Sequence, residues 1–141
     1  MDCTSFILAT LLNSSGIFES VTKLQKLAFL SIYEHGLEPF TSFKWHYYGP
    51  FSTDIQNTIN DLEEKGILSE KELNRVSCSG NEYTIKQFIL TMKGRRLAER
   101  WNTKISKENR IALVETIEEY GSRPLAEILD YVYKAYSPED L

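Results

Sequence analysis

The sequence has few of the features that mark secreted, membrane or metal-binding proteins. Its 141 residues include two cysteines, Cys3 and Cys78, which lie in different predicted elements and have no accompanying histidine pattern. We therefore expect free thiols, with no disulfide framework and no metal site. No run approaches the roughly 18 apolar residues that a membrane helix needs, and residues 1–15 lack the positively charged start of a signal peptide. The sequence predicts a cytoplasmic protein without a membrane partner.

Residues with catalytic chemistry are equally sparse. The chain has two histidines, and it contains no glycine-rich phosphate loop, no metal-ligand spacing and no serine elbow. His46 lies between Trp45 and Tyr47, where a histidine more often packs or forms a hydrogen bond than acts as a general base. We expect no catalytic residue, no cofactor and no enzymatic activity.

What the chain does have is the composition of an ordinary globular domain, with 42% hydrophobic and 26% charged residues. We expect a core over residues 1–102 and a helical extension over residues 103–141, which packs on the core or forms a dimer interface. Charge is unevenly spread, because Lys86–Arg110 holds eight basic and two acidic residues, whereas Ile111–Leu141 holds two basic and seven acidic ones. This asymmetry fits either a nucleic-acid face beside an acidic face or charge that serves solubility alone.

The stretch Phe43–Leu68 has the clearest local pattern. Gly49-Pro50 predicts a turn after a short aromatic strand or loop. Ser52 is placed to cap a helix that stops at Gly66. The apolar residues of this helix recur at spacings of four and three, so they share one face: Ile55, Ile59 and Leu62.

Hydrophobic periodicity predicts further elements on both sides of this stretch. Before it we expect helices over 4–12, capped by Thr4 or Ser5, and 21–35, joined by a link containing Ile17 and Phe18. Lys23 and Lys26 are expected on the polar side of the second helix. After it, an alternating strand over 82–90 pairs with a short strand at 76–77, and 69–75 is open between helix and loop. Helices are predicted over 92–104, 107–120 (apolar stripe Ile111, Val114 and Ile117, with Leu113 as a further candidate) and 124–136.

This order predicts an α+β, mostly α fold, namely a winged helix-turn-helix with a C-terminal helical extension. The helix after Ser52 takes the place of the recognition helix, and the following hairpin takes the place of the wing. Three separated motifs, Lys23–Leu27, Phe43–Ser52, and Leu62 with Gly66-Ile67-Leu68, resemble the YwgA-like and SocA/Panacea-type group of small prokaryotic winged-helix proteins. The resemblance covers residues 21–97.

The resemblance implies binding to a protein. Panacea-type members are antitoxins that neutralise a toxin by protein contact, and one of them is an adaptor for toxin proteolysis. The form Tyr47-Tyr48-Gly49-Pro50-Phe51-Ser52 in this chain is closer to the YwgA-like branch than to the usual Panacea form. The resemblance therefore implies a partner such as a toxin less directly than it implies the fold.

The leading hypothesis is a non-enzymatic, DNA-binding or transcription-regulating protein with duplex DNA as its partner. Amides on the candidate recognition helix can read adenine edges, a threonine can touch a thymine methyl, and cations on the wing can contact phosphates. Four carboxylates on the same helix oppose this role, so a solvated helix face remains the alternative. The candidate DNA-binding residues are Thr53, Gln56, Asn57, Asn60, Lys71, Arg75 and Lys86.

The alternative function is an antitoxin-like or proteolytic-adaptor module that binds a partner protein. Aromatic side chains dominate interface hot spots, and the candidate protein-binding residues are Trp45, Tyr47, Tyr48 and Phe51. Packing in the core is the competing interpretation, above all for Trp45 and Phe51. The last predicted helix has more apolar surface than one face needs, which predicts a homodimer through Ile128, Tyr131, Val132 and Tyr136.

Overall fold

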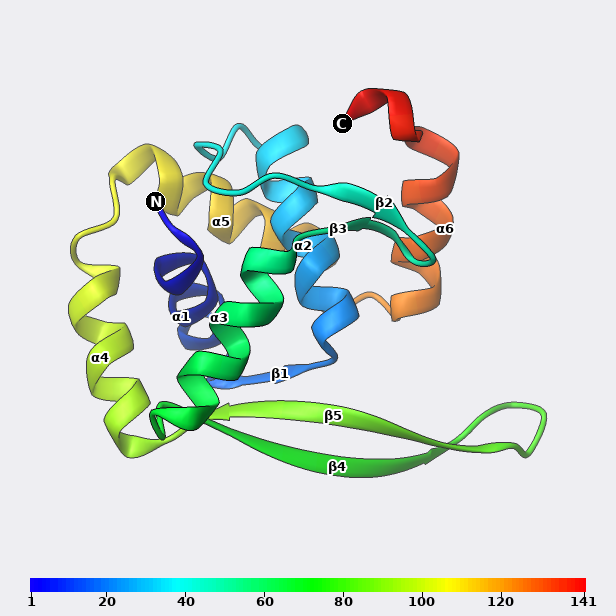
Figure 1. The fold of residues 1–141 in the computed structure, drawn as a ribbon, viewed down its shortest axis with the longest axis horizontal. Coiled ribbons are helices and arrows are strands. Elements are labelled where there is room, and N and C mark those ends of the chain that lie inside the picture. The colour runs from blue at the N-terminus through cyan, green and yellow to red at the C-terminus, as the bar shows by residue number, and fades with distance from the viewer.

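The structure, a computed structural model, describes residues 1–141 and contains six α-helices and two small antiparallel sheets (Figure 1). About half of the chain is helical, so the fold class is α+β. In chain order the elements are α1 (Cys3–Leu12), β1 (Ile17–Glu19), α2 (Val21–Tyr33), β2 (Lys44–His46), β3 (Gly49–Phe51), α3 (Thr53–Glu64), β4 (Leu68–Val76), β5 (Glu82–Leu90), α4 (Met92–Asn102), α5 (Lys107–Tyr120), α6 (Leu125–Ala135) and a short 3-10 turn (Pro138–Asp140).

Side-chain caps determine where most of the helices begin. Ser52, Thr91 and Ser106 accept hydrogen bonds from backbone N–H groups in the first turns of α3, α4 and α5, as the sequence predicts. The predicted cap of α1 is wrong, because Asp2 accepts from the Ser5 amide at 2.7 Å. A carboxylate at this position also favours the positive end of the helix dipole.

The core lies between two groups of helices. The middle of α1 is buried on every side, and this helix packs against α3 and α4. Helix α2 packs against α5, α6 and β3. A helix that is apolar around most of its circumference must be covered by several neighbours, and α1 has this composition.

The three-stranded sheet has the order β1-β5-β4, and it corrects two predictions. The expected link at Ile17 and Phe18 is strand β1, in which Phe18 pairs with the buried Phe88. Residues 69–75, left open between helix and loop, belong to strand β4. Strands β4 and β5 run below the helices in Figure 1, and the turn that joins them projects to the side. Most of their side chains are exposed, and β4 shows no apolar alternation.

The predicted turn at Gly49-Pro50 is also wrong. Tyr47 and Tyr48 form the turn, while Gly49 and Pro50 start strand β3, which pairs with β2. Gly49 has φ 84°, a backbone conformation that glycine adopts without strain. Pro50 is tolerated because a two-stranded sheet has only edge strands.

The C-terminal helices cover the core of their own chain. On α5 the three main residues of the predicted stripe are wrong, since Ile111 is exposed and Val114 and Ile117 are only half-buried, whereas Leu113, the further candidate, is buried. The face that packs toward α2 is mixed, because its polar members form hydrogen bonds inside the protein. Its buried residues are Asn109, Ala112, Leu113, Thr116 and Tyr120.

Two of the predicted dimer residues, Ile128 and Val132, are fully buried, each with an exposed fraction of 0%. Helix α6 directs its apolar face at α2 and β3 of the same chain, so neither residue can contact a second copy. The hydroxyls of Tyr131 and Tyr136 donate to Glu34. A homodimer stays a prediction, and it would need another surface. None of the helices combines the length and the apolar character needed to cross a membrane.

Candidate binding site

A cavity of about 330 Å³ lies between α2 and the β2–β3 hairpin. We call it the α2–hairpin cavity. Its walls come from three parts of the chain: α2, the hairpin with its turn, and the first half of α3. The residues that matter most below are Gln25, Lys26, His46, Tyr48, Phe51 and Gln56.

Gln25 fixes the position of the hairpin relative to α2. Its buried side chain donates to the Ser52 carbonyl oxygen and accepts from the Ser52 amide, both at 2.8 Å. Ser52 in turn caps α3 through the Ile55 amide at 3.2 Å. These paired bonds join α2, β3 and α3 around one residue, so the walls of the cavity are held in place without a ligand.

Lys26 contributes the only cation of the cavity wall, and only 1% of its surface is exposed. Its Nζ donates to the Pro50 carbonyl oxygen at 2.7 Å, and no carboxylate lies within ion-pair distance. Burial lowers the pKa of Lys26 to about 8, because desolvation disfavours the charged amine. The expectation that Lys26 lies on the polar side of α2 is wrong.

The turn of the hairpin presents two exposed tyrosines beside the cavity, Tyr47 at 87% and Tyr48 at 60% exposed. Helix α6 braces this turn, since the Tyr133 hydroxyl donates to the Tyr47 carbonyl oxygen. The Tyr133 ring also packs edge-on against Trp45, with ring centroids 5.6 Å apart. The hairpin is therefore supported from its outer side, as its position next to α6 in Figure 1 illustrates.

The four predicted protein-binding aromatics divide between the two faces of the hairpin. Trp45 pairs with Pro50 and is partly buried toward α6, whereas Phe51 pairs with Lys44 on the other face. Phe51 lies against His46, with ring centroids 5.2 Å apart, and both line the cavity. The structure thus brings Tyr47, Tyr48 and Phe51 to the cavity and gives Trp45 a packing position.

Sequence reasoning left Gln25 out of any site, considered Lys26 only as a further contact for a DNA backbone, and assigned Gln56 to DNA. The available signal was their place in one of the three resemblance motifs, Lys23–Leu27, beside the aromatic motif. Periodicity gave no signal, because Gln25 and Lys26 are adjacent on α2 and both are buried. Helix α2 is covered on most sides, so its polar residues are enclosed as well.

The candidate DNA-binding residues do not form one surface. Thr53, Asn57 and Asn60 are exposed on α3. On the β4–β5 hairpin, Lys71 and Arg75 point to one face and Lys86 to the other, because residues of a strand alternate and Lys86 pairs with Glu72. Two of these cations are already paired, Arg75 with Glu19 at 3.2 Å and Lys86 with Glu70 at 3.4 Å.

Carboxylates surround the exposed face of α3. Glu63 and Glu70 lie close together where α3 meets β4, and burial together with the charge of Glu70 raises the pKa of Glu63. Such a surface repels phosphates and opposes the counterion release that supplies most nonspecific DNA affinity. The acidic residues involved are Asp54, Asp61, Glu63, Glu64, Glu70 and Glu72.

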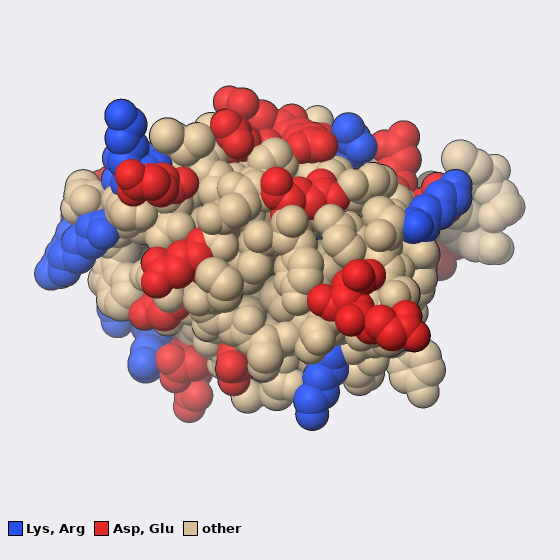
Figure 2. Space-filling view, turned by 90° about the horizontal axis from the view of Figure 1, so that it is seen from above, with Lys and Arg blue, Asp and Glu red and all other residues tan.

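The basic side chains of α4 have the opposite character. Lys93, Arg96 and Arg100 follow at spacings of three and four, which places them along one side of α4, and Lys104 follows two residues after the helix ends. None of them forms an ion pair with a carboxylate. Figure 2 shows a contrasting face, on which carboxylates gather and basic side chains lie mainly toward the edges. We call Lys93, Arg96, Arg100 and Lys104 the α4 basic row.

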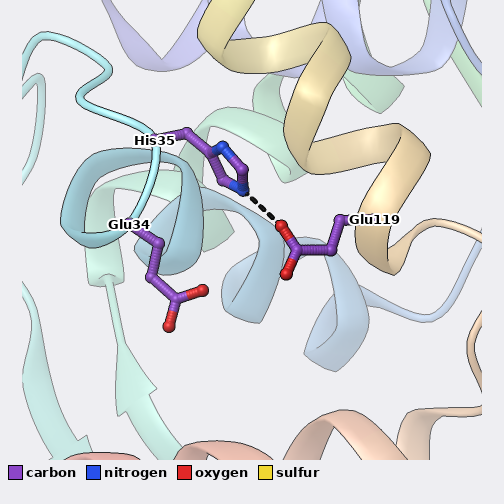
Figure 3. A group of neighbouring side chains, drawn as sticks. All are labelled: Glu34, His35 and Glu119. Carbon is purple, nitrogen blue, oxygen red and sulfur yellow. Dashed lines mark hydrogen bonds and ion pairs between the residues drawn. The ribbon is translucent and has the colours of Figure 1, made fainter.

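A third cluster, shown in Figure 3, joins the end of α2 to α5 through Glu34, His35 and Glu119. Its ligand atoms lie within 4.8 Å of one another, a spacing compatible with a cation. However, His35 already lies between Glu115 at 3.3 Å and Glu119 at 2.7 Å. The Glu34 carboxylate is also occupied, because it accepts from three hydroxyls, those of Tyr120, Tyr131 and Tyr136.

These bonds give the cluster a structural role. Burial alone would raise the pKa of the Glu34 carboxyl, but the three tyrosine hydrogen bonds outweigh it and lower the pKa overall. Burial and the bond to Glu34 raise the pKa of Tyr120. The cluster therefore holds the C-terminal helices against α2.

No family model, curated protein or solved structure matches the chain. The class that the structure itself defines is an α+β protein of six helices and small antiparallel sheets.

Proposed function

We propose that this protein is a non-catalytic winged-helix module that binds a segment of a partner protein at the α2–hairpin cavity. The order α1, β1, α2, α3, β4, β5, with a sheet in the order β1-β5-β4, supports the winged-helix assignment. The β2–β3 hairpin is then an insertion between the second and third helices. The insertion forms one wall of the cavity, so the part added to the basic fold is the part that binds.

The observation that carries the proposal is the exposure of Tyr47 and Tyr48 on a braced turn beside a preformed cavity. Tyrosines in such positions supply large contact areas, and they are enriched among interface hot spots. A turn that is already held in place loses little conformational entropy on binding. A protein segment can therefore place a side chain in the cavity and pack its backbone against the two rings.

The resemblance to antitoxin-type proteins supports the same site. Lys26 of one motif and Tyr47, Tyr48, Gly49 and Phe51 of another line the same cavity, although the two motifs are separated in sequence. An antitoxin-like or adaptor role is the form of protein binding that we propose for this chain.

A displayed library of random peptides with free C-termini tests the proposal. We expect selection on the wild-type protein to enrich peptides whose binding is lost in a Tyr47→Ala/Tyr48→Ala variant. Tyr83→Ala is the matched control, since Tyr83 is an exposed tyrosine on the other hairpin. Enriched peptides that bind the double variant as tightly as the wild type would overturn the proposal.

The α4 basic row favours a second candidate function, nucleic-acid binding. Four cations without a carboxylate partner, if all contact phosphates, predict that log K falls with log salt at a slope of about −3 to −4. Fluorescence anisotropy of a labelled DNA duplex between low and physiological salt measures this slope. If the α4 basic row contacts the DNA, Arg96→Glu/Arg100→Glu should abolish the binding. If α3 is instead the recognition helix, Asn57→Ala/Asn60→Ala should abolish it. Absence of binding at low salt excludes both interpretations.

A further inference from the structure

The ammonium group of Lys26 lacks partners that a buried charge ordinarily has. It carries three N–H donors, and the Pro50 carbonyl oxygen accepts one of them. A buried charge without a counter-ion is costly, and proteins usually pair such groups. Burying the charged amine of Lys26 therefore costs free energy, and an anion bound in the cavity would lower that cost.

The rest of the cavity lining also favours an anion of a particular kind. None of its lining residues is an aspartate or a glutamate, so nothing in the wall competes for Lys26 or repels a negative group. His46, Tyr47, Tyr48 and Phe51 supply aromatic surface around the same space. The volume, about 330 Å³, is at the small end of ligand pockets and suits one or two residues of a peptide.

We infer that the cavity binds the C-terminal residue of the partner, with Lys26 pairing its terminal carboxylate and the aromatic wall holding an apolar side chain. A C-terminal apolar residue brings both groups at once, whereas an internal aspartate or glutamate side chain brings only the carboxylate. The inference rests on the proposed function, because it names the ligand chemistry of the same site. The low pKa of Lys26 agrees with a cation that has no counter-charge before the partner binds.

Three small probes distinguish the possible ligands: N-acetyl-phenylalanine, its neutral C-terminal amide, and N-acetyl-glutamic acid α-amide. The readout is the ¹³Cε signal of Lys26 followed against pH by NMR, which reports the pKa of that amine in the intact protein. We expect saturating N-acetyl-phenylalanine to raise this pKa, because a bound carboxylate favours the charged amine. The neutral amide should leave the signal unchanged, and the glutamic acid probe should bind more weakly.

Substitution of Lys26 provides the second measurement. Lys26→Met should weaken binding of N-acetyl-phenylalanine by about 10- to 100-fold, the range expected for a charge-assisted hydrogen bond. Tyr83→Ala should bind it as the wild type does. Equal binding of acid and amide, or wild-type affinity in Lys26→Met, would overturn the inference, and tighter binding of the glutamic acid probe would overturn the choice of a chain end.

The two proposals fail in different ways. Displayed peptides that depend on Tyr47 and Tyr48 but bind the Lys26→Met variant normally would leave the proposed function standing and remove Lys26 as the carboxylate partner. If Lys26→Met does not fold, the pKa measurement on the wild-type protein decides the question alone.

Discussion

Lys26 makes a prediction about the stability of the unliganded protein. Its pKa falls from 10.5 in a free side chain to about 8 in the folded protein, because burial disfavours the charged amine. Between these two values the unfolded chain binds a proton that the folded chain does not. Stability therefore rises with pH across this window, and the gain is lost as pH falls through 8.

The size of the effect follows from the two pKa values. Each pKa unit corresponds to about 1.4 kcal/mol, so raising the pH from 7 to 10 should add about 2 to 3 kcal/mol through Lys26 alone. Because other groups also titrate in this range, the quantity to measure is the difference between wild type and Lys26→Met. Urea unfolding followed by circular dichroism at pH 7, 8, 9 and 10 gives it, provided that the m-value stays constant.

A particular outcome would refute this reasoning. If wild type and Lys26→Met change in parallel with pH, Lys26 titrates alike in the folded and unfolded chains and is not buried without a counter-ion. A difference that grows only above pH 10 would likewise show that the folded pKa is not lowered. Lys71→Met is the control, because Lys71 is an exposed lysine on β4 that forms no ion pair.

Three further predictions concern the rest of the molecule. Because hydrogen bonds lower the pKa of Glu34, its stabilising contribution is present above the ordinary carboxyl pKa of 4.5 and is lost as pH falls below it. In urea titrations, Glu34→Gln should lower the free energy of unfolding by about 1 to 3 kcal/mol at pH 7 and make it depend less on pH in the acid range. Unaltered stability in Glu34→Gln would contradict the structural role of the cluster. Gly94→Ala should destabilise by about 1 to 3 kcal/mol or more in thermal unfolding, since a Cβ there would lie 2.0 Å from the Ile67 carbonyl oxygen, and a wild-type melting temperature would disprove this close packing. Tyr47→Ala/Tyr48→Ala should change the free energy of unfolding by no more than about 1 kcal/mol, because both side chains are exposed; a larger loss would mean that these rings serve the fold more than binding.

Several elements of the fold could be predicted from neighbouring residues in the sequence. Ser52 and the spacing of Ile55, Ile59 and Leu62 specify α3 completely, because a cap and an apolar stripe act within a few residues. The alternation of residues in β5 and the glycine that ends α3, Gly66, are likewise signals within a few residues of the chain. The hairpin β2–β3 was missed in part, since Gly49-Pro50 is a turn signal in isolation and becomes a strand only through pairing with Trp45 and His46.

Sequence patterns did not predict which polar residues are buried. The sequence placed Lys26 on a solvent-exposed face because lysine normally lies there, and the structure encloses it because α5, α6 and β3 cover α2 from several sides. The same holds for Glu34, whose three tyrosine partners lie 86 to 102 residues away. The apolar surface of α6, read as a dimer interface, is used within the chain for the same reason.

By itself, the sequence determined the helices, most of their caps, the mixed α+β class and the set of aromatic residues around Tyr47. Those features depend on neighbours within one or two turns of the chain. Only the tertiary structure decided which polar groups are buried, which cations are paired and which aromatics face a cavity. Each of these depends on contacts between segments far apart in sequence, and at the α2–hairpin cavity such contacts bring a buried lysine beside two exposed tyrosines.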